Sequence, residues 1–308
     1  MADAIRITAP ATSANLGPGF DTLALALDFT NEVVVTRRAG PLEVVVTGEG
    51  ADELPTDESN LVCQALASGL GSLDGLHIEC VNRIPLRSGL GSSAAATCSG
   101  LVAANALGLL RWTPDEMVRR GAEFDGHRDN VAACVWGGIV VATADGHVTQ
   151  LPIPEDLLMV VVTPAADIDT RSARALLPEA VPFGDVAVSL GNAITLALMI
   201  ERGEFDEIGR VLGDRLHEPY REGRIPGLAA LRGMAGQDGC LGATISGSGP
   251  SVLLWCNRSA ASDIADRASA LLAAEGITST ARALRIAPGG IRGRWIDNPD
   301  TRLAKAVG

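Results

Sequence analysis

The sequence predicts an α+β fold, and three observations lead to this prediction. Short runs rich in β-branched residues occur between longer segments whose apolar residues recur at helical spacing. A segment rich in alanine and other small residues, typical of a closely packed helix, follows a glycine- and serine-rich loop. The 308 residues are 47% hydrophobic but only 3% aromatic, so aliphatic side chains must fill the core. A mixture of helices and strands of this kind indicates the α+β class.

The first half of the chain is expected to begin with strands. Runs rich in β-branched residues lie at 5–8, 32–37 and 42–47, and Gly40 with Pro41 between the last two indicates a hairpin-like turn. The next elements are predicted as a helix at 60–70 capped by Ser59 or Asn60, a strand at 76–83, a helix of small residues at 93–110 and a helix at 114–125. A turn at Gly126 then leads to Asn130.

The second half continues the mixture. The same signals predict strands at 137–143, 157–163, 243–246, 251–256 and 281–286, and helices at 186–202, 205–216 and 262–274. Turn residues accumulate at 144–154. We therefore expect two domains, 1–150 and 151–308.

Composition narrows the range of partners. The net charge is -12 and the chain has no run of basic residues, so nucleic acid and anionic membranes are not expected partners. Apolar stretches such as 157–162 are far shorter than the roughly 20 residues that cross a bilayer. The first residues lack the basic and apolar pattern of a signal peptide, so a cytoplasmic location is expected. The six cysteines are widely spaced and are predicted to be buried free thiols.

One loop has the composition of an anion-binding site. It lies between a predicted strand and a predicted helix and reads Pro85, Leu86, Arg87, Ser88, Gly89, Leu90, Gly91, Ser92, Ser93, Ala94, Ala95. Glycines allow the backbone to approach a ligand, and the first N–H groups of the following helix have no internal partners. The serine hydroxyls add groups that can contact phosphate or the ligand shell of magnesium.

Two common nucleotide motifs do not fit this loop. Gly89, Gly91 and Ala94 match the spacing of the dinucleotide fingerprint, but no acidic residue ends a second strand about 20 residues later. A Walker loop requires a lysine, and the single lysine of the chain is Lys305. Binding of ATP without a loop lysine remains open.

Two further segments share the small, flexible character of this loop. Residues 10–21 read PATSANLGPGFD, and residues 242–252 read GATISGSGPSV. In order and spacing, the three segments resemble the motifs of the GHMP kinases, the superfamily of galactokinase, homoserine kinase, mevalonate kinase and phosphomevalonate kinase. The first segment, together with 123–131, 170–178 and 218–227, resembles the homoserine kinases specifically. The resemblance covers about residues 10–252.

The resemblance implies a fold and a reaction. The fold would be a two-domain GHMP kinase fold, with an N-terminal ribosomal-S5-like domain and a C-terminal ferredoxin-like domain, and ATP and substrate between them. The reaction would transfer the γ-phosphoryl group of ATP to the hydroxyl of L-homoserine, a step of threonine biosynthesis. A homodimer is also implied.

The resemblance also assigns residues to roles. Asn60 and the loop from Pro85 to Ala95 would bind ATP, while Ser93 and Glu123 would bind Mg²⁺. Glu123, Asn130 and Arg174 would be catalytic. The substrate-binding residues would be Asn15, Asp21, His127, Asn130, Thr170, Arg174 and Arg221.

The chemistry of these residues is compatible with the implied roles. A loose phosphoryl-transfer transition state is stabilised mainly by positioning and positive charge, so a strong base is not essential. Asp21 can receive the ammonium group of an amino acid, and Arg174 with Arg221 can receive its carboxylate. His127 and Asp129 are the rival candidates for a base, although an aspartate in such a turn more often caps backbone N–H groups.

Three residues depart from the usual homoserine kinase pattern. Asp125 replaces a glutamate, Arg128 replaces a proline, and Trp136 replaces an aliphatic residue. A cation beside Asn130 can change which acceptor fits. Two alternatives to homoserine phosphorylation are therefore kept, one with another acceptor and one from another functional class. One is a GHMP kinase for a mevalonate-like or sugar alcohol, and the other is a non-catalytic sensor of ATP or a metabolite.

Overall fold

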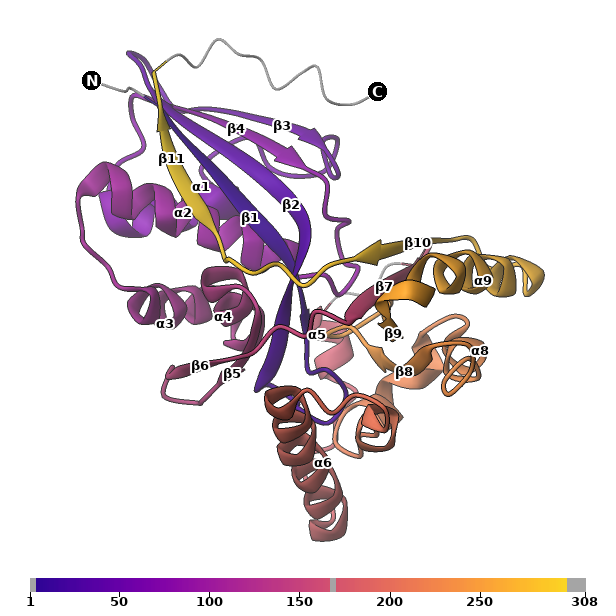
Figure 1. The fold of residues 1–308 in the computed structure, drawn as a ribbon. Helices are drawn as coiled ribbons and strands as arrows, with labels where there is room; N and C mark the ends of the chain where they lie inside the picture. Colours follow the sequence, from indigo (N-terminus) through magenta and orange to yellow (C-terminus); the bar gives the residue numbers. More distant parts are fainter. Residues whose placement is uncertain (1–3, 167–169, 298–308) are drawn as a thin grey trace.

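Two β-sheets organise the part of the chain that the structure describes (Figure 1). A computed structural model describes residues 4–166 and 170–297. The strands of the first sheet are β1 (Ala4–Ala14), β2 (Leu23–Arg37), β3 (Glu43–Gly48), β4 (Leu76–Asn82), β5 (Ile139–Ala142), β6 (Val148–Leu151) and β11 (Arg292–Ile296). Their order is β11-β1-β2-β4-β3, with β5 paired to the far end of β2 and β6 paired to β5.

The hairpin predicted between 32–37 and 42–47 is wrong. β4 pairs antiparallel with β2 and parallel with β3, so it separates the two strands. The turn after β2 is instead held to the segment before β4, because the Arg38 N–H donates to Gly75 O and the Gly75 N–H donates to Gly40 O, both at 2.9 Å. Gly40 and Pro41 indicate a reversal of the chain, but a local signal cannot specify which strand pairs next.

Helices cover one face of the first sheet (Figure 1). They are α1 (Leu61–Leu70), α2 (Ser92–Gly108), α3 (Pro114–Asp125) and α4 (Asp129–Trp136). The first three confirm the predicted helices, and Asn60 is the N-cap of α1 because its side chain accepts a hydrogen bond from the Val62 N–H. α4 was not predicted, because it follows Gly126 so closely that the segment resembles a turn.

The second sheet confirms the ferredoxin-like expectation. Its strands are β7 (Leu157–Pro164), β8 (Cys240–Ile245), β9 (Val252–Asn257) and β10 (Ser279–Leu284), in the antiparallel order β10-β7-β9-β8. The remaining helical elements are α5 (Thr170–Arg174), α6 (Phe183–Arg202), η1 (Ile208–Val211), α7 (Glu218–Arg221), η2 (Glu222–Arg224), α8 (Leu228–Arg232), η3 (Arg258–Ala260) and α9 (Ala261–Ala274).

The helix predicted at 205–216 is wrong, since only the short 3-10 helix η1 forms there. Gly209 packs so closely on β8 that a Cβ would lie 2.1 Å from Leu241 O. Beyond η1, the Asp214 carboxylate accepts hydrogen bonds from the N–H groups of Leu216, His217 and Glu218. This capping arrangement starts a new helical turn and prevents one continuous helix.

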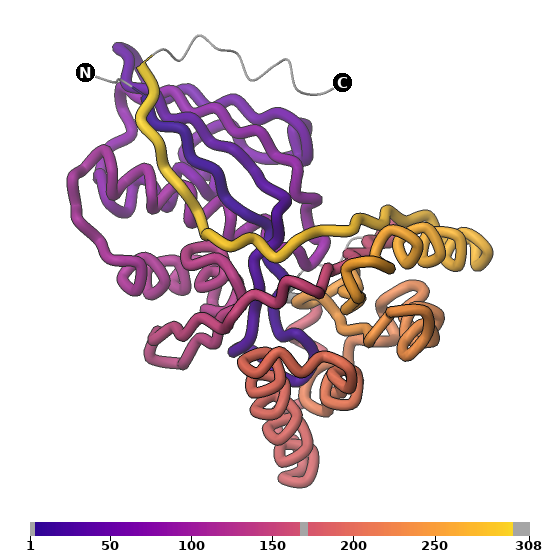
Figure 2. Tube along the Cα trace, viewed as in Figure 1, coloured from indigo at the N-terminus to yellow at the C-terminus, as the bar shows by residue number. Residues whose placement is uncertain are grey.

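One of the hydrophobic clusters spans both halves of the chain. A single cluster of buried side chains includes Leu25 and Ile139 from the first sheet and Met159 and Trp255 from the second. The chain also returns to its starting sheet, because the segment after β10 crosses to β1 and forms β11 (Figure 2). β11 thus lies in the first sheet although it is beyond the predicted boundary, and the division into 1–150 and 151–308 stays a prediction. All six cysteines are free and buried, as predicted.

Candidate active site

Three loops far apart in the sequence meet where the two sheets join. Ser246, after β8, donates from Oγ to Gly89 O at 2.7 Å in the loop before α2. The Gly247 N–H donates to Ala14 O at 3.1 Å, at the end of β1. These contacts join the three glycine- and serine-rich segments that the sequence singled out.

Two glycines of the loop before α2 are required by this close packing. Gly89 and Gly91 have φ angles of 78° and 67°, which favour glycine. A Cβ on Gly89 would lie 2.2 Å from Ser246 O, and one on Gly91 would lie 1.9 Å from Thr12 Oγ1. The loop backbone therefore approaches its neighbours so closely at these two positions that no residue with a Cβ fits there.

The N-terminus of α2 can bind an anion. Gly91 is its N-cap and provides no side-chain hydrogen bond, so the first-turn N–H groups of this 17-residue helix have no intrahelical partner. The helix dipole adds a partial positive charge at the same end. Ser92, Ser93 and Ala94 face a cavity of about 590 Å³. The arrangement suits a phosphate group.

Most of the predicted site residues line this one cavity. They are Asn15, Asp21, Arg87, Ser88, Gly89, Leu90, Gly91, Ser92, Ser93, Ala94, Glu123, His127, Asn130, Arg174 and Arg221. Pro85 and Leu86 line a neighbouring cavity of about 760 Å³, and Arg87 and Ser88 border both. Ala95 is buried in the core. Thr170 begins α5, but its side chain lies outside the described part of the structure.

The side chain of Asn60 is hydrogen-bonded to the neighbouring backbone. Its Oδ1 accepts from the Val62 N–H at 3.0 Å, and its Nδ2 donates to Pro55 O at 2.7 Å. Its side chain therefore fixes the start of α1, and its predicted contact with a nucleotide stays a prediction.

Two carboxylates flank the N-terminus of α2. Ser93 Oγ donates to Asp125 Oδ1 at 2.7 Å, and burial raises the pKa of Asp125 above its ordinary value. Glu123 is exposed at the mouth of the same cavity, two residues earlier on α3. The structure thus gives Ser93 an acidic partner, Asp125, which sequence reasoning treated only as a departure.

His127 and Asp129 form a pair at the start of α4. The His127 Nδ1 atom lies 3.0 Å from Asp129 Oδ1. Burial acts to lower the pKa of His127, but the hydrogen bond and charge of Asp129 outweigh it and raise the pKa above its ordinary value. Asp129 also accepts from the Asn130 N–H at 2.6 Å, so its carboxylate is bonded to the local backbone, although the N-cap residue of α4 is Arg128.

Hydrogen bonds fix the two asparagines that line the cavity. Asn130 Oδ1 accepts from Thr12 Oγ1 at 2.7 Å. Asn15 donates from Nδ2 to Gly247 O and accepts at Oδ1 from the Asp21 N–H, both at 3.0 Å. Both side-chain amides are therefore held by partners distant in sequence, Thr12 for Asn130 and Gly247 for Asn15, and Asn15 is also held by the nearby Asp21.

Arg174 and Asp21 form an ion pair at the cavity rim. Nη1 of Arg174 donates to Asp21 Oδ1 at 3.1 Å, and Nη2 donates to the second carboxylate oxygen. The guanidinium carbon also lies 5.5 Å from the ring centroid of Phe20. Phe20 is close to two cations, because the guanidinium carbon of Arg221 is 5.7 Å from the same ring centroid.

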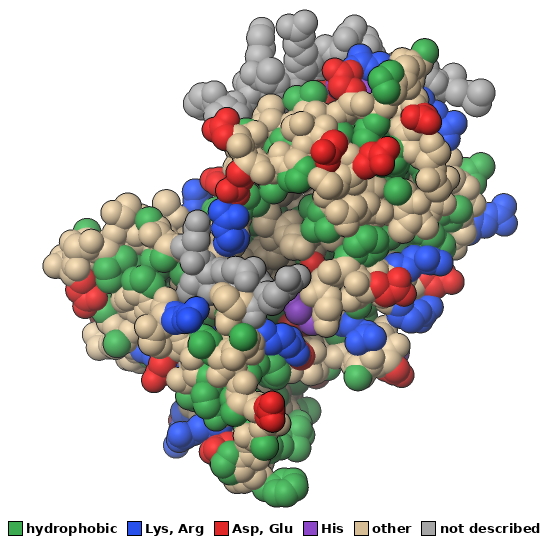
Figure 3. All heavy atoms as spheres, turned by 180° about the vertical axis from the view of Figure 1, so that it is seen from behind, with side chains coloured by type: hydrophobic (Ala, Val, Ile, Leu, Met, Phe, Trp, Pro, Cys, Tyr) green, Lys and Arg blue, Asp and Glu red, His purple; other side chains and the backbone are tan. Residues whose placement is uncertain are grey.

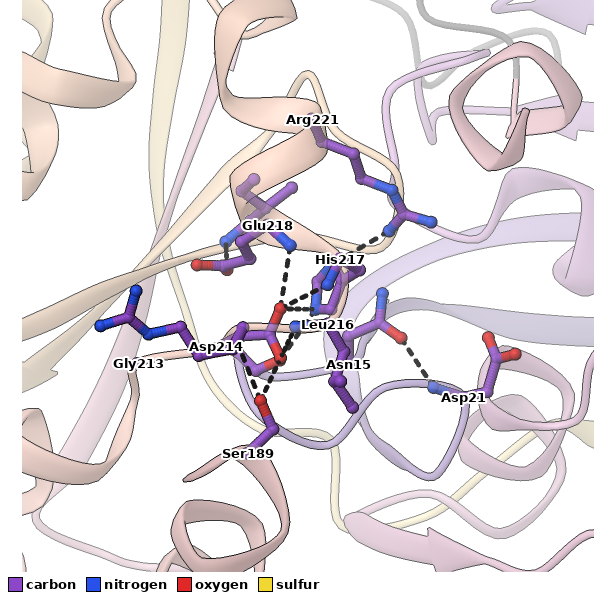
Figure 4. Close-up of polar contacts among 12 residues, drawn as sticks. Asn15, Asp21, Ser189, Gly213, Asp214, Leu216, His217, Glu218 and Arg221 are labelled. Carbon is purple, nitrogen blue, oxygen red and sulfur yellow. Dashed lines mark hydrogen bonds and ion pairs between the residues drawn. The ribbon is translucent and has the colours of Figure 1, made fainter. Parts of the chain in front are cut away.

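Arg221 is held in place by a buried network (Figure 4). Its Nη1 donates to Gly247 O at 2.9 Å and to His217 Nδ1 at 3.1 Å. Nε2 of His217 lies 2.8 Å from Gly17 O. Asp214 supports the turn beneath, accepting from Ser189 Oγ at 2.9 Å and from the backbone N–H groups described above.

Sequence reasoning missed four residues that support the side chains lining the cavity. They are Thr12, Phe20, Asp214 and His217, which hold Asn130, Arg174 or Arg221 in place. The four-residue spacing between His217 and Arg221 was a usable signal, because it places both on one face of a helical turn. The contact of His217 with Gly17, 200 residues away, had no such signal.

Comparisons with known proteins show which family the chain belongs to. The pattern of the GHMP kinases N terminal domain matches residues 60–138, and that of the GHMP kinases C terminal domain matches residues 196–274. The homoserine kinase of Moorella thermoacetica is 35% identical over 285 residues, which are 90% of this chain and 96% of that protein. The homoserine kinase of Streptomyces avermitilis is 37% identical over 93% of this chain and 97% of its own length.

The chain belongs to the homoserine kinase family. The crystal structure of homoserine kinase from Cytophaga hutchinsonii superposes with a TM-score of 0.87 at 31% identity, covering 96% of this chain and 98% of that one. Galactokinase from Lactococcus lactis, at 14% identity and a TM-score of 0.68, shares the fold. Of the three departures from the usual homoserine kinase pattern, Asp125 lines the cavity, whereas Arg128 and Trp136 are not among its lining residues.

Proposed function

We propose that this chain transfers the γ-phosphoryl group of ATP to the hydroxyl of L-homoserine. One observation carries the proposal: the N-terminus of α2, suited to phosphate, and the charged side chains of Asp21, Arg174 and Arg221 line the same cavity of about 590 Å³. A cavity of this size can hold a small amino acid beside the terminal phosphates of a nucleotide.

In this proposal the chain contributes mainly positioning and charge. The α2 N-terminus and the loop before it hold the phosphates, and the arginines orient the carboxylate of the acceptor. Asp21 is available for the ammonium group, and its carboxylate also pairs with Arg174. A bound zwitterion would insert between Asp21 and the arginines. The ion pair between Asp21 and Arg174 would then be replaced by two ion pairs, one from Asp21 to the ammonium group and one from the arginines to the carboxylate.

The donor set also fits a magnesium ion. Ser93, Glu123 and Asp125 supply hard oxygen atoms on the side of the cavity next to α2. Among the described residues, no group of three His, Cys, Asp or Glu side chains is placed to hold a metal ion without other ligands. Magnesium commonly combines one or two carboxylates with phosphate oxygens, so we expect the nucleotide to complete the site. When bound, the ion would neutralise phosphate charge.

The expectations about cellular location, partners and assembly stay predictions. They are a cytoplasmic location, no nucleic acid or membrane partner, and assembly as a homodimer.

An assay of ADP release tests the proposal. Homoserine, mevalonate, galactose and threonine are offered separately with MgATP, and ATP alone gives the background rate. We expect the largest kcat/KM with homoserine. A larger kcat/KM for mevalonate or galactose would assign the chain to another alcohol, and ATP binding without turnover of any acceptor would indicate a sensor.

A further inference from the structure

The cavity of the candidate active site is lined by two sets of groups whose separation must be fixed. The surface is hollowed where the two halves of the molecule meet, as the view from behind shows (Figure 3). The α2 N-terminus, suited to phosphate, lines the cavity together with Asn130, Arg174 and Arg221, which come from other elements. Phosphoryl transfer requires the reacting atoms to approach to about 3–3.5 Å. A residue that bonds to both sets can therefore affect the rate without touching either substrate.

Thr12 bonds to both sets. It lies near the end of β1, and its side chain is fully buried. Its N–H donates to Leu90 O at 3.1 Å, in the loop before α2, and its Oγ1 donates to Asn130 Oδ1 at 2.7 Å, in the first turn of α4. A Cβ on Gly91 would lie 1.9 Å from the same Oγ1 atom, so the hydroxyl lies directly against the loop backbone. These contacts connect the loop before α2 to α4.

The hydrogen bond from Thr12 sets the orientation of the Asn130 side chain. The Thr12 hydroxyl has no other hydrogen-bond partner among residues 4–166 and 170–297. If the amide were reversed, Nδ2 would donate to Thr12 and the buried hydroxyl proton would lack an acceptor, which is unfavourable. Oδ1 therefore faces Thr12. Nδ2, which has no hydrogen bond to a described residue, is left for the cavity that Asn130 lines.

We propose that Thr12 is a positioning residue for phosphoryl transfer, because its hydroxyl holds Asn130 with Nδ2 directed at the transferring phosphoryl group. The inference rests on the proposed function, since it concerns the same cavity, but it does not depend on which alcohol is the acceptor.

The chemistry of the step calls for a donor at this position. The acceptor oxygen bonds to the γ-phosphorus, the bond from that phosphorus to the ADP oxygen breaks, and the hydroxyl proton is released to water. Negative charge is spread over the transferring phosphoryl oxygens in the transition state. An N–H group held in place stabilises that charge, whereas the carbonyl oxygen of a reversed amide would repel it. Asn130 takes no proton in this step, because Nδ2 can only donate.

Thr12→Val tests the role of the hydroxyl. Valine has the branching of threonine but no donor, and the bond from the N–H of this residue to Leu90 O remains. We expect kcat to fall by tenfold or more at saturating MgATP and acceptor, while the KM for ATP changes less than threefold. Thr12→Ser keeps the donor and should retain kcat within threefold. Unchanged kcat in Thr12→Val, or an equal loss in both variants, would overturn the proposal.

Thr97→Val is the matched control. Thr97 lies on α2 and is fully buried like Thr12, but its Oγ1 has no hydrogen-bond partner among the described residues. The same change there removes a hydroxyl without breaking a hydrogen bond, so kcat should stay within twofold of the wild type. A tenfold loss in Thr97→Val would show that loss of any buried hydroxyl near the site slows the enzyme, and it would overturn the specific role of Thr12.

A double-mutant cycle shows whether Thr12 acts through Asn130. The kcat is measured for Thr12→Val, Asn130→Ala and the double variant. Once the Asn130 amide is absent, Thr12→Val should cause less than a further twofold loss, because the hydroxyl has no side chain left to orient. A full further tenfold loss would mean that Thr12 acts through the loop before α2, against the proposal.

Asn130→Asp tests the direction of Nδ2 while Thr12 stays intact. A carboxylate can accept the Thr12 hydrogen bond with one oxygen, and it then turns a second acceptor in place of the donor into the cavity. The kcat should fall by 100-fold or more. Retained kcat would overturn the donor role of Nδ2, even if Thr12→Val does not fold. Urea unfolding of each variant ensures that kcat refers to folded protein.

The outcomes separate this inference from the proposed function. The tests use whichever acceptor the wild type phosphorylates best. A wild type that phosphorylates no acceptor would refute the proposed function and the positioning role with it. An active wild type whose kcat is unchanged by Thr12→Val would refute the positioning role alone.

Discussion

Arg221 donates a hydrogen bond to Nδ1 of His217 at 3.1 Å, and this contact defines the tautomer of the imidazole. Nδ1 must accept, because a guanidinium group can only donate. The proton therefore lies on Nε2, which donates to Gly17 O. Burial, together with the nearby Arg221 cation, lowers the pKa of His217 to about 4 despite the opposing charge of Asp214. A protonated imidazole would lose its acceptor and face a cation.

A pH dependence of stability follows. In the unfolded chain His217 takes up a proton near its ordinary pKa of about 6.5, but in the folded chain it stays neutral until about pH 4. Its contribution to the free energy of unfolding is thus retained above about pH 6.5 and lost as the pH falls towards 4, by up to about 3 kcal/mol. Other groups also titrate in this range, so the measurement is a difference between wild type and His217→Gln.

Urea unfolding at several pH values checks this expectation. The stability advantage of the wild type over His217→Gln should shrink on acidification between pH 6.5 and 4. A difference that is constant across that range would mean that His217 titrates normally in the fold.

Gly91 gives a second prediction. Gly91→Ala should raise the KM for ATP by tenfold or more, because a Cβ 1.9 Å from Thr12 Oγ1 must displace the loop or Thr12. Gly71→Ala is the control, since Gly71 also has a positive φ, of 80°, but no atom lies within 4 Å of its Cβ position. Initial rates over a range of ATP concentrations measure the effect, and an unchanged KM would show that the phosphates bind elsewhere.

Much of the fold could be predicted because its signals are local. Pro114 begins α3 and Gly126 follows its end, as the sequence indicated. The small residues of α2 have a packing reason, since Gly100 lies against the α1 backbone, where a Cβ would be 2.3 Å from Val62 O. Signals of this kind depend on a few neighbouring residues, so one sequence suffices to recognise them.

The errors have a common physical cause. The insertion of β4 between β2 and β3, and the return of β11 to β1, depend on contacts between segments far apart in sequence. The same holds within the site, where the sequence suggested Arg221 but not the His217 that receives its hydrogen bond. Chemistry-bearing residues can be chosen by type and motif, whereas the residues that hold them in place are visible only in the fold.

Glu123 gives a third prediction. Glu123→Gln should reduce kcat by 100-fold or more while the dissociation constant for ATP changes less than threefold, because the change removes a charge proposed for magnesium but leaves the α2 N-terminus intact. Glu275→Gln, at an exposed position beyond α9, is the control. Turnover and calorimetric binding are measured in saturating magnesium. Retained kcat would remove Glu123 from the proposed metal site.

The last prediction concerns the choice of acceptor. Arg221→Leu should lower kcat/KM for homoserine by tenfold or more, because a charge-assisted hydrogen bond to the substrate carboxylate contributes about 1.5–3 kcal/mol. The KM for ATP should be unchanged, since the phosphates are proposed to lie at α2. Arg210→Leu is the control, because Arg210 is exposed and pairs only with Glu207 among the ion pairs of the described residues.

A second acceptor makes this test specific to the carboxylate. 3-Aminopropanol has the ammonium and hydroxyl groups but no carboxylate, so it should react poorly with the wild type and lose little more in Arg221→Leu. Arg174→Leu should show the same pattern with a smaller loss, because Arg174 is more exposed and its charge is already shared with Asp21. Since Arg221 also supports His217, unfolding of each variant is measured in parallel. If Arg221→Leu damages both acceptors equally while remaining folded, Arg221 acts on the phosphoryl group or on the site as a whole, and the carboxylate of the acceptor is recognised by other residues.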